Sequence, residues 1–269
     1  LALVYGVLRV FNMALGQIAL VGGYTTWWLS SYGTPLLFAI FGGILSSLLI
    51  TWLCFEGWIA PFYKRHRFLP IVTTIAMGMI LDGLIIIFFG TSPKAILQQS
   101  HLLPFQNFSI TLEQSILIGI TIIIFSATAW LLHGTSLGRA LRATTQNPEA
   151  AESLGIHSKF LHRMVFIASG MLAGAAGIFI GIDQNLSPTL GLTITIKAYA
   201  AVTAAGLGNL WGTVLCAYGI ALLEQLVVGL PWFGVYLPSG YQNSIALVVI
   251  IVILLWKPDG IFHTRARVS

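Results

Sequence analysis

The most constraining feature of this sequence is a series of long apolar blocks that contain almost no charge. Residues 69–90 form one such block, and Asp82 is its single charged residue. About 20 apolar residues in a helix cross the roughly 30 Å hydrocarbon core of a bilayer. Only 8% of the chain is charged and 57% is hydrophobic, whereas a soluble domain is about 25% charged. The chain is therefore predicted to be a polytopic membrane protein.

The apolar blocks predict about eight membrane segments, the first of them partial. They cover residues 1–11, 13–29, 36–59, 69–90, 112–132, 160–182, 193–230 and 242–256. Lipid offers no partner for backbone amides, so spanning segments are helices or closed barrels. Barrel strands alternate apolar and polar residues over about ten positions, whereas these blocks are continuous and longer. We expect an all-α multi-helix bundle. Because the chain opens at Leu1 inside an apolar run, we also expect part of the first segment to be missing.

Basic residues predict the orientation of the bundle. They gather at residues 64–67, 139–163 and 257–267, while the intervening loops carry only Lys94 and, near a helix end, Lys197. By the positive-inside rule these three regions and the C-terminus are cytoplasmic. The net charge of +5 is explained in this way without nucleic acid, because no basic stripe with interleaved aromatic residues is present.

One block is too long for a single crossing. Because Arg163 and Lys257 are both predicted to be cytoplasmic, the chain must cross the membrane an even number of times between them. The blocks at residues 160–182 and 242–256 account for two crossings, so residues 193–230 contribute two more or none. Glycine and asparagine gather at residues 205–212 and should interrupt a helix there. We predict two short segments joined by a tight turn, and broken helices of this kind are typical of transporter cores.

Few residues point to chemistry of their own. The chain has no nucleotide-binding or metalloprotease motif, and no cofactor, metal or catalytic site is predicted. Cys54 and Cys216 lie in apolar blocks and are interpreted as buried small side chains. Acidic residues in or beside the membrane are expensive there. Asp82 and Glu224 lie inside blocks, and Glu56 and Asp183 end them; each either lines a translocation path or is interfacial or neutralised by a partner in the bundle.

Two pairs of glycines recur at four-residue spacing, Gly170 with Gly174 and Gly177 with Gly181. This spacing lets helix backbones approach closely in lipid. It predicts tight packing, either within the chain or at a dimer interface.

The loop at residues 134–159 is predicted to contain a short capped helix. Asn147 is a good N-cap and Pro148 suits the first helical position. Glu149 would lie in the first turn, where the helix dipole favours an anion, and Gly155 would end the helix. Ala150, Ala151 and Leu154 would share one apolar face. Because a two-turn helix is marginal alone in water, we expect it to dock on a cytoplasmic partner.

The stretch Glu149-Ala150-Ala151-x-x-x-Gly155 resembles the loop by which ABC importer permeases engage their ATPases. Over nearly its whole length the chain resembles the LivH-type permease of branched-chain amino acid importers. The matching stretches are residues 136–143, Glu56 with Pro61-x-Tyr63, residues 90–93, residues 205–212 and residues 257–262. The resemblance implies a single importer transmembrane domain over residues 1–269. It implies ATPase-coupling roles for Arg139, Arg142, Asn147, Pro148, Glu149, Ala150, Ala151, Leu154 and Gly155.

The resemblance also implies partners and a location. They are a second, homologous permease, two cytoplasmic ATPases and an extracytoplasmic binding protein, all at the bacterial plasma (inner) membrane. The chain itself would not be an enzyme. The family has a first broken helix near residues 12–17, where this chain reads Asn12-Met13-Ala14-Leu15-Gly16-Gln17 and lacks the family's His and acidic residue. The candidate pathway residues are Asn12, Gln17, Asp82, Gly206, Gly208 and Asn209.

Two alternatives remain open at this point. The same fold resembles urea and short-chain amide permeases. A secondary transporter or channel would explain the broken helices and Asp82, but it would not explain the capped helix in the cytoplasmic loop.

Overall fold

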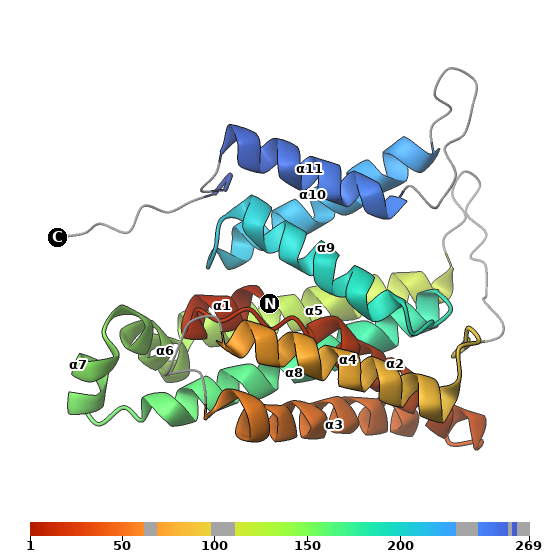
Figure 1. Ribbon diagram of the computed structural model, residues 1–269, viewed down its shortest axis with the longest axis horizontal. Coiled ribbons are helices and arrows are strands. Elements are labelled where there is room, and N and C mark those ends of the chain that lie inside the picture. The colour runs from red at the N-terminus through yellow and green to blue at the C-terminus, as the bar shows by residue number, and fades with distance from the viewer. Residues whose placement is uncertain (62–68, 98–110, 230–241, 258–259, 263–269) are drawn as a thin grey trace. The chain divides into compact units, whose positions relative to one another are not determined.

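Figure 1 shows the computed structural model, which describes residues 1–61, 69–97, 111–229, 242–257 and 260–262. Over these residues the chain consists of helices, their connections and one isolated antiparallel bridge between Lys94 and Leu186. The α-helices are α1 (Ala2–Leu8), α2 (Leu15–Ser31), α3 (Leu36–Cys54), α4 (Leu69–Phe89), α5 (Leu112–Gly134), α6 (Ser136–Gln146), α7 (Pro148–Ser153), α8 (Ser158–Asp183), α9 (Leu190–Ala205), α10 (Leu210–Gly229) and α11 (Gln242–Trp256). A π-helix, η1 (Phe55–Ile59), continues α3.

Each apolar block of the sequence contains a helix. Among the described residues, five helical segments are long and apolar enough to span a membrane: Leu36–Ile59, Leu69–Phe89, Leu112–Gly134, Ser158–Asp183 and Leu210–Val227. Leu190–Ala205 and Leu247–Trp256 are shorter apolar helices. The prediction of an all-α polytopic membrane protein is confirmed. The basic residues at 64–67 and beyond 262, which the orientation argument used, lie outside the described residues.

The helices form two compact units. One unit comprises Met13–Gly191 and therefore holds α2 to α8. The other comprises Leu1–Asn12 together with Leu192–Ser269 and holds α1, most of α9, α10 and α11.

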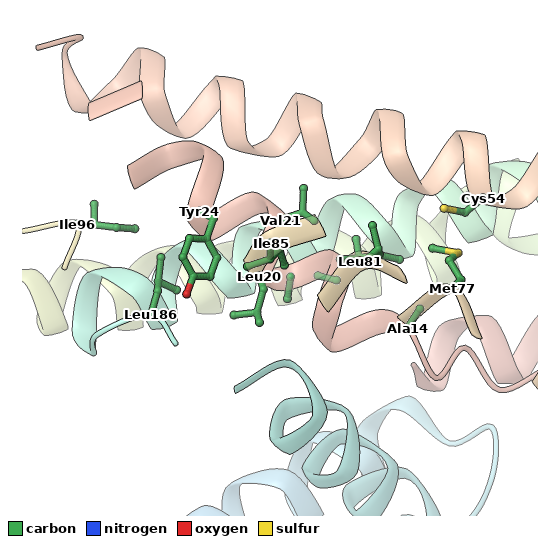
Figure 2. Close-up of a cluster of buried hydrophobic side chains, with 13 residues drawn as sticks. Ala14, Leu20, Val21, Tyr24, Cys54, Met77, Leu81, Ile85, Ile96 and Leu186 are labelled. Carbon is green, nitrogen blue, oxygen red and sulfur yellow. The ribbon is translucent and has the colours of Figure 1, made fainter. Parts of the chain in front are cut away.

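Helix α2 is the centre of the first unit. It packs against α3, α4 and α8, and every residue from 16 to 24 is buried. A helix that is apolar all round belongs in an interior. Figure 2 shows Leu20 and Tyr24 of α2 in one cluster with Leu81 and Ile85 of α4. Any polar side chain on this part of α2 therefore faces protein.

Glycines on α8 allow the backbones of α2 and α3 to approach α8 closely. A Cβ atom at Gly170 would overlap Thr51, and one at Gly174 would overlap Ser47. A Cβ atom at Gly177 would overlap the backbone of Ala19. The four-residue spacing therefore serves packing within the chain, which was one of the two predicted interpretations.

Contacts at the two ends of α8 show which segments of the first unit lie beside each end. At the start of α8, Arg163 Nε lies 2.8 Å from Glu56 Oε1 in η1. Beyond the other end, the Leu186 amide donates to the Lys94 carbonyl at 2.7 Å, and the Lys94 amide donates back at 2.9 Å. The end of α3 thus lies beside the start of α8, and the segments that follow α4 and α8 meet at the opposite end.

In the second unit the long block is broken as predicted. Helix α9 ends at Ala205 and α10 begins at Leu210. The turn between them contains Gly206 at φ 96° and Gly208 at φ 93°, a backbone region that L side chains rarely adopt. Helix α10 then packs against α11. The first interruption is also present. Because α1 ends at Leu8 and α2 starts at Leu15, Asn12 lies in the connection and Gln17 in the first turn of α2.

Candidate functional site

The predicted short helix in the loop is present as α7, with the predicted caps. The Asn147 side-chain oxygen accepts a hydrogen bond from the Ala150 amide at 3.0 Å, and Pro148 occupies the first helical position. Glu149 lies in the first turn. After the helix, Gly155 adopts φ 82°. All of these features follow from local signals, which is why the sequence predicts them.

The predicted apolar face of α7 needs a correction. Ala151 is buried against the protein, whereas Ala150 is exposed and Leu154 is 80% exposed. Neighbouring helix positions differ by about 100°, while residues four apart share a side. Ala150 and Leu154 therefore point outward together, and Ala151 points toward α6 and α8, against which α7 packs.

Helix α6 precedes α7, and the sequence analysis predicted no helix at these residues. The Thr135 side chain caps it by accepting from the Gly138 amide at 3.3 Å. Leu141 and Thr144 form its buried side. The available signal was the spacing of Leu137, Leu141 and Thr144, which is three to four residues, after a good N-cap. The loop is therefore two helices in series.

The two arginines of α6 differ in their contacts. Arg142 donates from Nη1 to the Leu132 carbonyl at 2.6 Å, so it satisfies a carbonyl in the last turn of α5 that has no partner within its own helix. Arg139 is exposed. Both side chains are exposed, and Arg142 in addition ties α6 to a spanning helix.

Two of the candidate pathway residues meet in the first unit. Gln17 Nε2 on α2 donates to Asp82 Oδ2 on α4 at 3.3 Å. Gly78 lies beside this pair, and a Cβ atom there would be in ordinary contact with Gln17 Oε1 at 3.4 Å. The other two oxygens, Gln17 Oε1 and Asp82 Oδ1, are buried without a hydrogen-bond partner among the described residues. Asp82 thus has a partner inside its unit, and a role in the pathway stays a prediction.

Asn12 is the candidate pathway residue of the first interruption. It is buried within the connection between α1 and α2. The next residue, Met13, donates its amide to Thr74 Oγ1 on α4 at 3.2 Å. The connection between α1 and α2 therefore places the Met13 amide where it donates a hydrogen bond to α4. The sequence located the break but gave no sign of this contact.

The remaining candidates, Gly206, Gly208 and Asn209, form the turn of the second unit. Asn209 Oδ1 accepts from the Gly212 amide at 3.0 Å and caps α10. Its Nδ2 donates to the Phe262 carbonyl at 2.9 Å. The amides of Ile261 and Phe262 donate to the Ala204 and Ala205 carbonyls at 2.8 and 2.9 Å. Residues 260–262, called the tail below, therefore cap α9 and hold the α9–α10 turn. The turn thus has a structural role, whatever its role in transport.

A partly buried ion pair joins α9 to α10, and the sequence did not predict it. Lys197 Nζ lies 2.8 Å from Glu224 Oε2. Lys197 occurs near the middle of α9 rather than near a helix end as expected, and Glu224 is buried rather than interfacial. Because the two residues are on different helices, no spacing rule brings them together.

Comparison with known proteins gives the chain a family. A model of the family described as "Branched-chain amino acid transport system / permease component" matches residues 1–255. The chain belongs to this family. The resemblance on which the sequence analysis relied is thereby confirmed.

Curated relatives of this permease component cover most of its length. It is 30% identical to the probable branched-chain amino acid transport permease protein LivH of Methanocaldococcus jannaschii, over 97% of this chain and 85% of the relative. It is 23% identical to the high-affinity branched-chain amino acid transport system permease protein BraD of Pseudomonas aeruginosa, over 96% and 88%. It is 26% identical to the autoinducer 2 import system permease protein LsrC of Escherichia coli O9:H4, over 84% and 62%. No solved structure matches the chain.

Proposed function

We propose that this chain is the permease subunit of an ATP-driven importer of branched-chain amino acids in a bacterial plasma membrane. Its partners are a second, homologous permease, two cytoplasmic ATPases and an extracytoplasmic binding protein. Membership of the permease family and the names of the LivH and BraD relatives support this proposal. ATP hydrolysis belongs to the separate ATPase subunits.

The observation that carries the coupling role is the exposure of Leu154, the residue directly after α7, outside the spanning segments. A side chain of this size that is 80% exposed on a polar loop has no lipid to cover it. Together with Ala150 and Glu149, which are also exposed, it presents a small apolar patch beside a charge. We assign the ATPase contact to this patch, flanked by Arg139.

The anchoring of α7 supports transmission of force into the bundle. Helix α7 packs against α6 and α8, and α6 packs against α5. Arg142 binds the last turn of α5 through the Leu132 carbonyl. A displacement of α7 would therefore move the adjoining ends of two spanning helices. Asn147, Pro148, Ala151 and Gly155 act in this scheme by shaping α7 and fixing its position against α6 and α8.

The orientation is supported by two observations. The exposed Arg139, Lys159 and Arg163 lie at one end of α5 and α8, and positive residues favour the cytoplasmic side. In the second unit, hydrogen bonds hold the α9–α10 turn against residues 261–262. We therefore propose that the loop, the turn and the C-terminus are all cytoplasmic.

The substrate is the part of the proposal that most needs a test, because the LsrC relative is named for autoinducer 2. The importer is reconstituted in liposomes with its ATPases and binding protein, and uptake of labelled leucine is measured. We expect uptake to require ATP and the ATPases, and unlabelled valine and isoleucine to compete with it. Competition by urea or acetamide alone would favour an amide permease. Uptake without the ATPases would favour a secondary transporter or channel.

A further inference from the structure

The Lys197–Glu224 pair is more costly than a structural link between two apolar helices requires. The Glu224 side chain is only 5% exposed and that of Lys197 is 33% exposed. Removing two charges from water costs several kcal/mol per ion, and apolar residues of similar size often hold helices together as well or better. Ionisable residues within membrane segments usually take part in function. The pair is therefore expected to do more than join α9 to α10.

The pair has unused hydrogen-bonding capacity. Glu224 Oε1 is buried and has no hydrogen-bond partner among the described residues. Among the described residues, Lys197 donates to Glu224 Oε2 at 2.8 Å, which uses one of the three donors of its ammonium group. A buried acceptor without a donor is unfavourable, because it has lost its hydrogen bonds to water and gained none in the protein. A ligand that supplies a donor to Glu224 would relieve this deficit.

We propose that Lys197 and Glu224 form a binding site for the charged head group of a free amino acid. This inference rests on the proposed function. In the structure the Lys197 ammonium occupies the place beside Glu224 that the α-ammonium of a substrate would take. An arriving amino acid would give its ammonium to Glu224 and its carboxylate to Lys197, the more exposed partner.

Charge balance favours this exchange over the alternatives. The pair is neutral before binding, and it remains neutral with a zwitterion because each charge keeps an opposite partner. An amine without a carboxylate would leave a positive charge unpaired, and a carboxylate without an amine would leave a negative one. Losing one partner leaves the other charge unpaired, which is strongly unfavourable where that charge is buried, as it is at Glu224. A site of this kind therefore selects zwitterions and gives no advantage to urea or amides.

The test uses the complete importer in liposomes with leucine carried by the binding protein. In the double variant Lys197→Met, Glu224→Gln both charges are removed together, so neither is left buried alone. We expect it to retain its ATPases and its binding-protein-stimulated ATP hydrolysis, while leucine uptake falls at least tenfold. Leucine uptake above half of the wild-type rate would overturn the proposal.

The charge-swapped variant Lys197→Glu, Glu224→Lys separates recognition from a purely structural link, and it decides the question if the neutral variant does not assemble. The swap keeps an ion pair between α9 and α10 but reverses its direction. Restored assembly with uptake still at least tenfold low would support the proposal. Restored uptake would show that the pair only fixes the two helices. Failure of the proposed function looks different, because the wild-type importer would then show no ATP-dependent uptake of leucine.

Discussion

Gly260 lies so close to Gly206 that a Cβ atom at position 260 would overlap the Gly206 backbone. Gly260 also has φ 88°, where a side chain is strained. The contact lets the tail reach the last carbonyls of α9. We predict that Gly260→Ala loosens the tail and lowers the free energy of unfolding by about 1–3 kcal/mol. Thermal unfolding in detergent measures this. Gly219→Ala on α10 is the control. The added Cβ atom would meet nothing within 4 Å, so this substitution should be neutral or stabilising.

The tail contact also predicts topology. Leu207 in the α9–α10 turn and Leu154 after α7 are both exposed, and we place both on the cytoplasmic side. Single cysteines introduced by Leu207→Cys or Leu154→Cys, with Cys54 and Cys216 changed to Ala, should react with a membrane-impermeant maleimide in inside-out vesicles only. Labelling of the two positions from opposite sides would rule out the two-crossing arrangement of α9 and α10.

The packing of α8 on α2 predicts an unequal effect of two glycine substitutions. A Cβ atom at Gly177 meets the Ala19 backbone, which cannot move aside as a flexible side chain can. Gly177→Ala should therefore destabilise the permease by roughly 1–3 kcal/mol or prevent its assembly. Gly119→Ala on α5 meets no atom within 4 Å and should have no adverse effect. The stability of each variant is measured by its expression level and by its melting temperature in detergent. Equal stability of the two variants would contradict the close approach of α2 and α8.

The Gln17–Asp82 pair predicts a selective loss of transport. Asp82→Asn removes the charge from a carboxylate that accepts from a buried glutamine, and we expect leucine uptake to fall severalfold. Asp183 offers a matched control, because it accepts from Gln114 Nε2 at 2.9 Å on an exposed surface. Asp183→Asn should leave uptake near the wild-type rate. Near-normal uptake by both variants would leave Asp82 without a role in the pathway.

The sequence predicted those parts of the molecule that local chemistry determines. The caps of α7 depend on Asn147, Pro148 and Gly155, which lie within a few residues of one another, and the apolar blocks depend on hydropathy alone. The rotation of each helix depends on distant neighbours. Ala151 is buried because α6 and α8 lie beside it. Lys197 meets Glu224 across 27 residues of chain, and no single-sequence periodicity reports this.

The central claim is that α7 couples ATP hydrolysis to the permease. The exposed Leu154 can be changed without disturbing packing, so Leu154→Asp should weaken docking of the ATPases while the bundle stays folded. Glu149→Lys with Gly155→Val should act in the same direction, because the reversed first-turn charge costs roughly 1 kcal/mol and Val resists the positive φ of Gly155. Leu207→Asp, on an exposed leucine outside the α6–α7 loop, is the control.

The most direct measurement is co-purification of each variant with the ATPases, followed by binding-protein-stimulated ATP hydrolysis in liposomes. We expect Leu154→Asp and the Glu149→Lys, Gly155→Val double variant to lose most of both signals, at a melting temperature near that of the wild type. Leu207→Asp should keep both signals. Wild-type co-purification and wild-type stimulated hydrolysis in the Leu154→Asp and double variants would contradict the assignment of α7 as the coupling element.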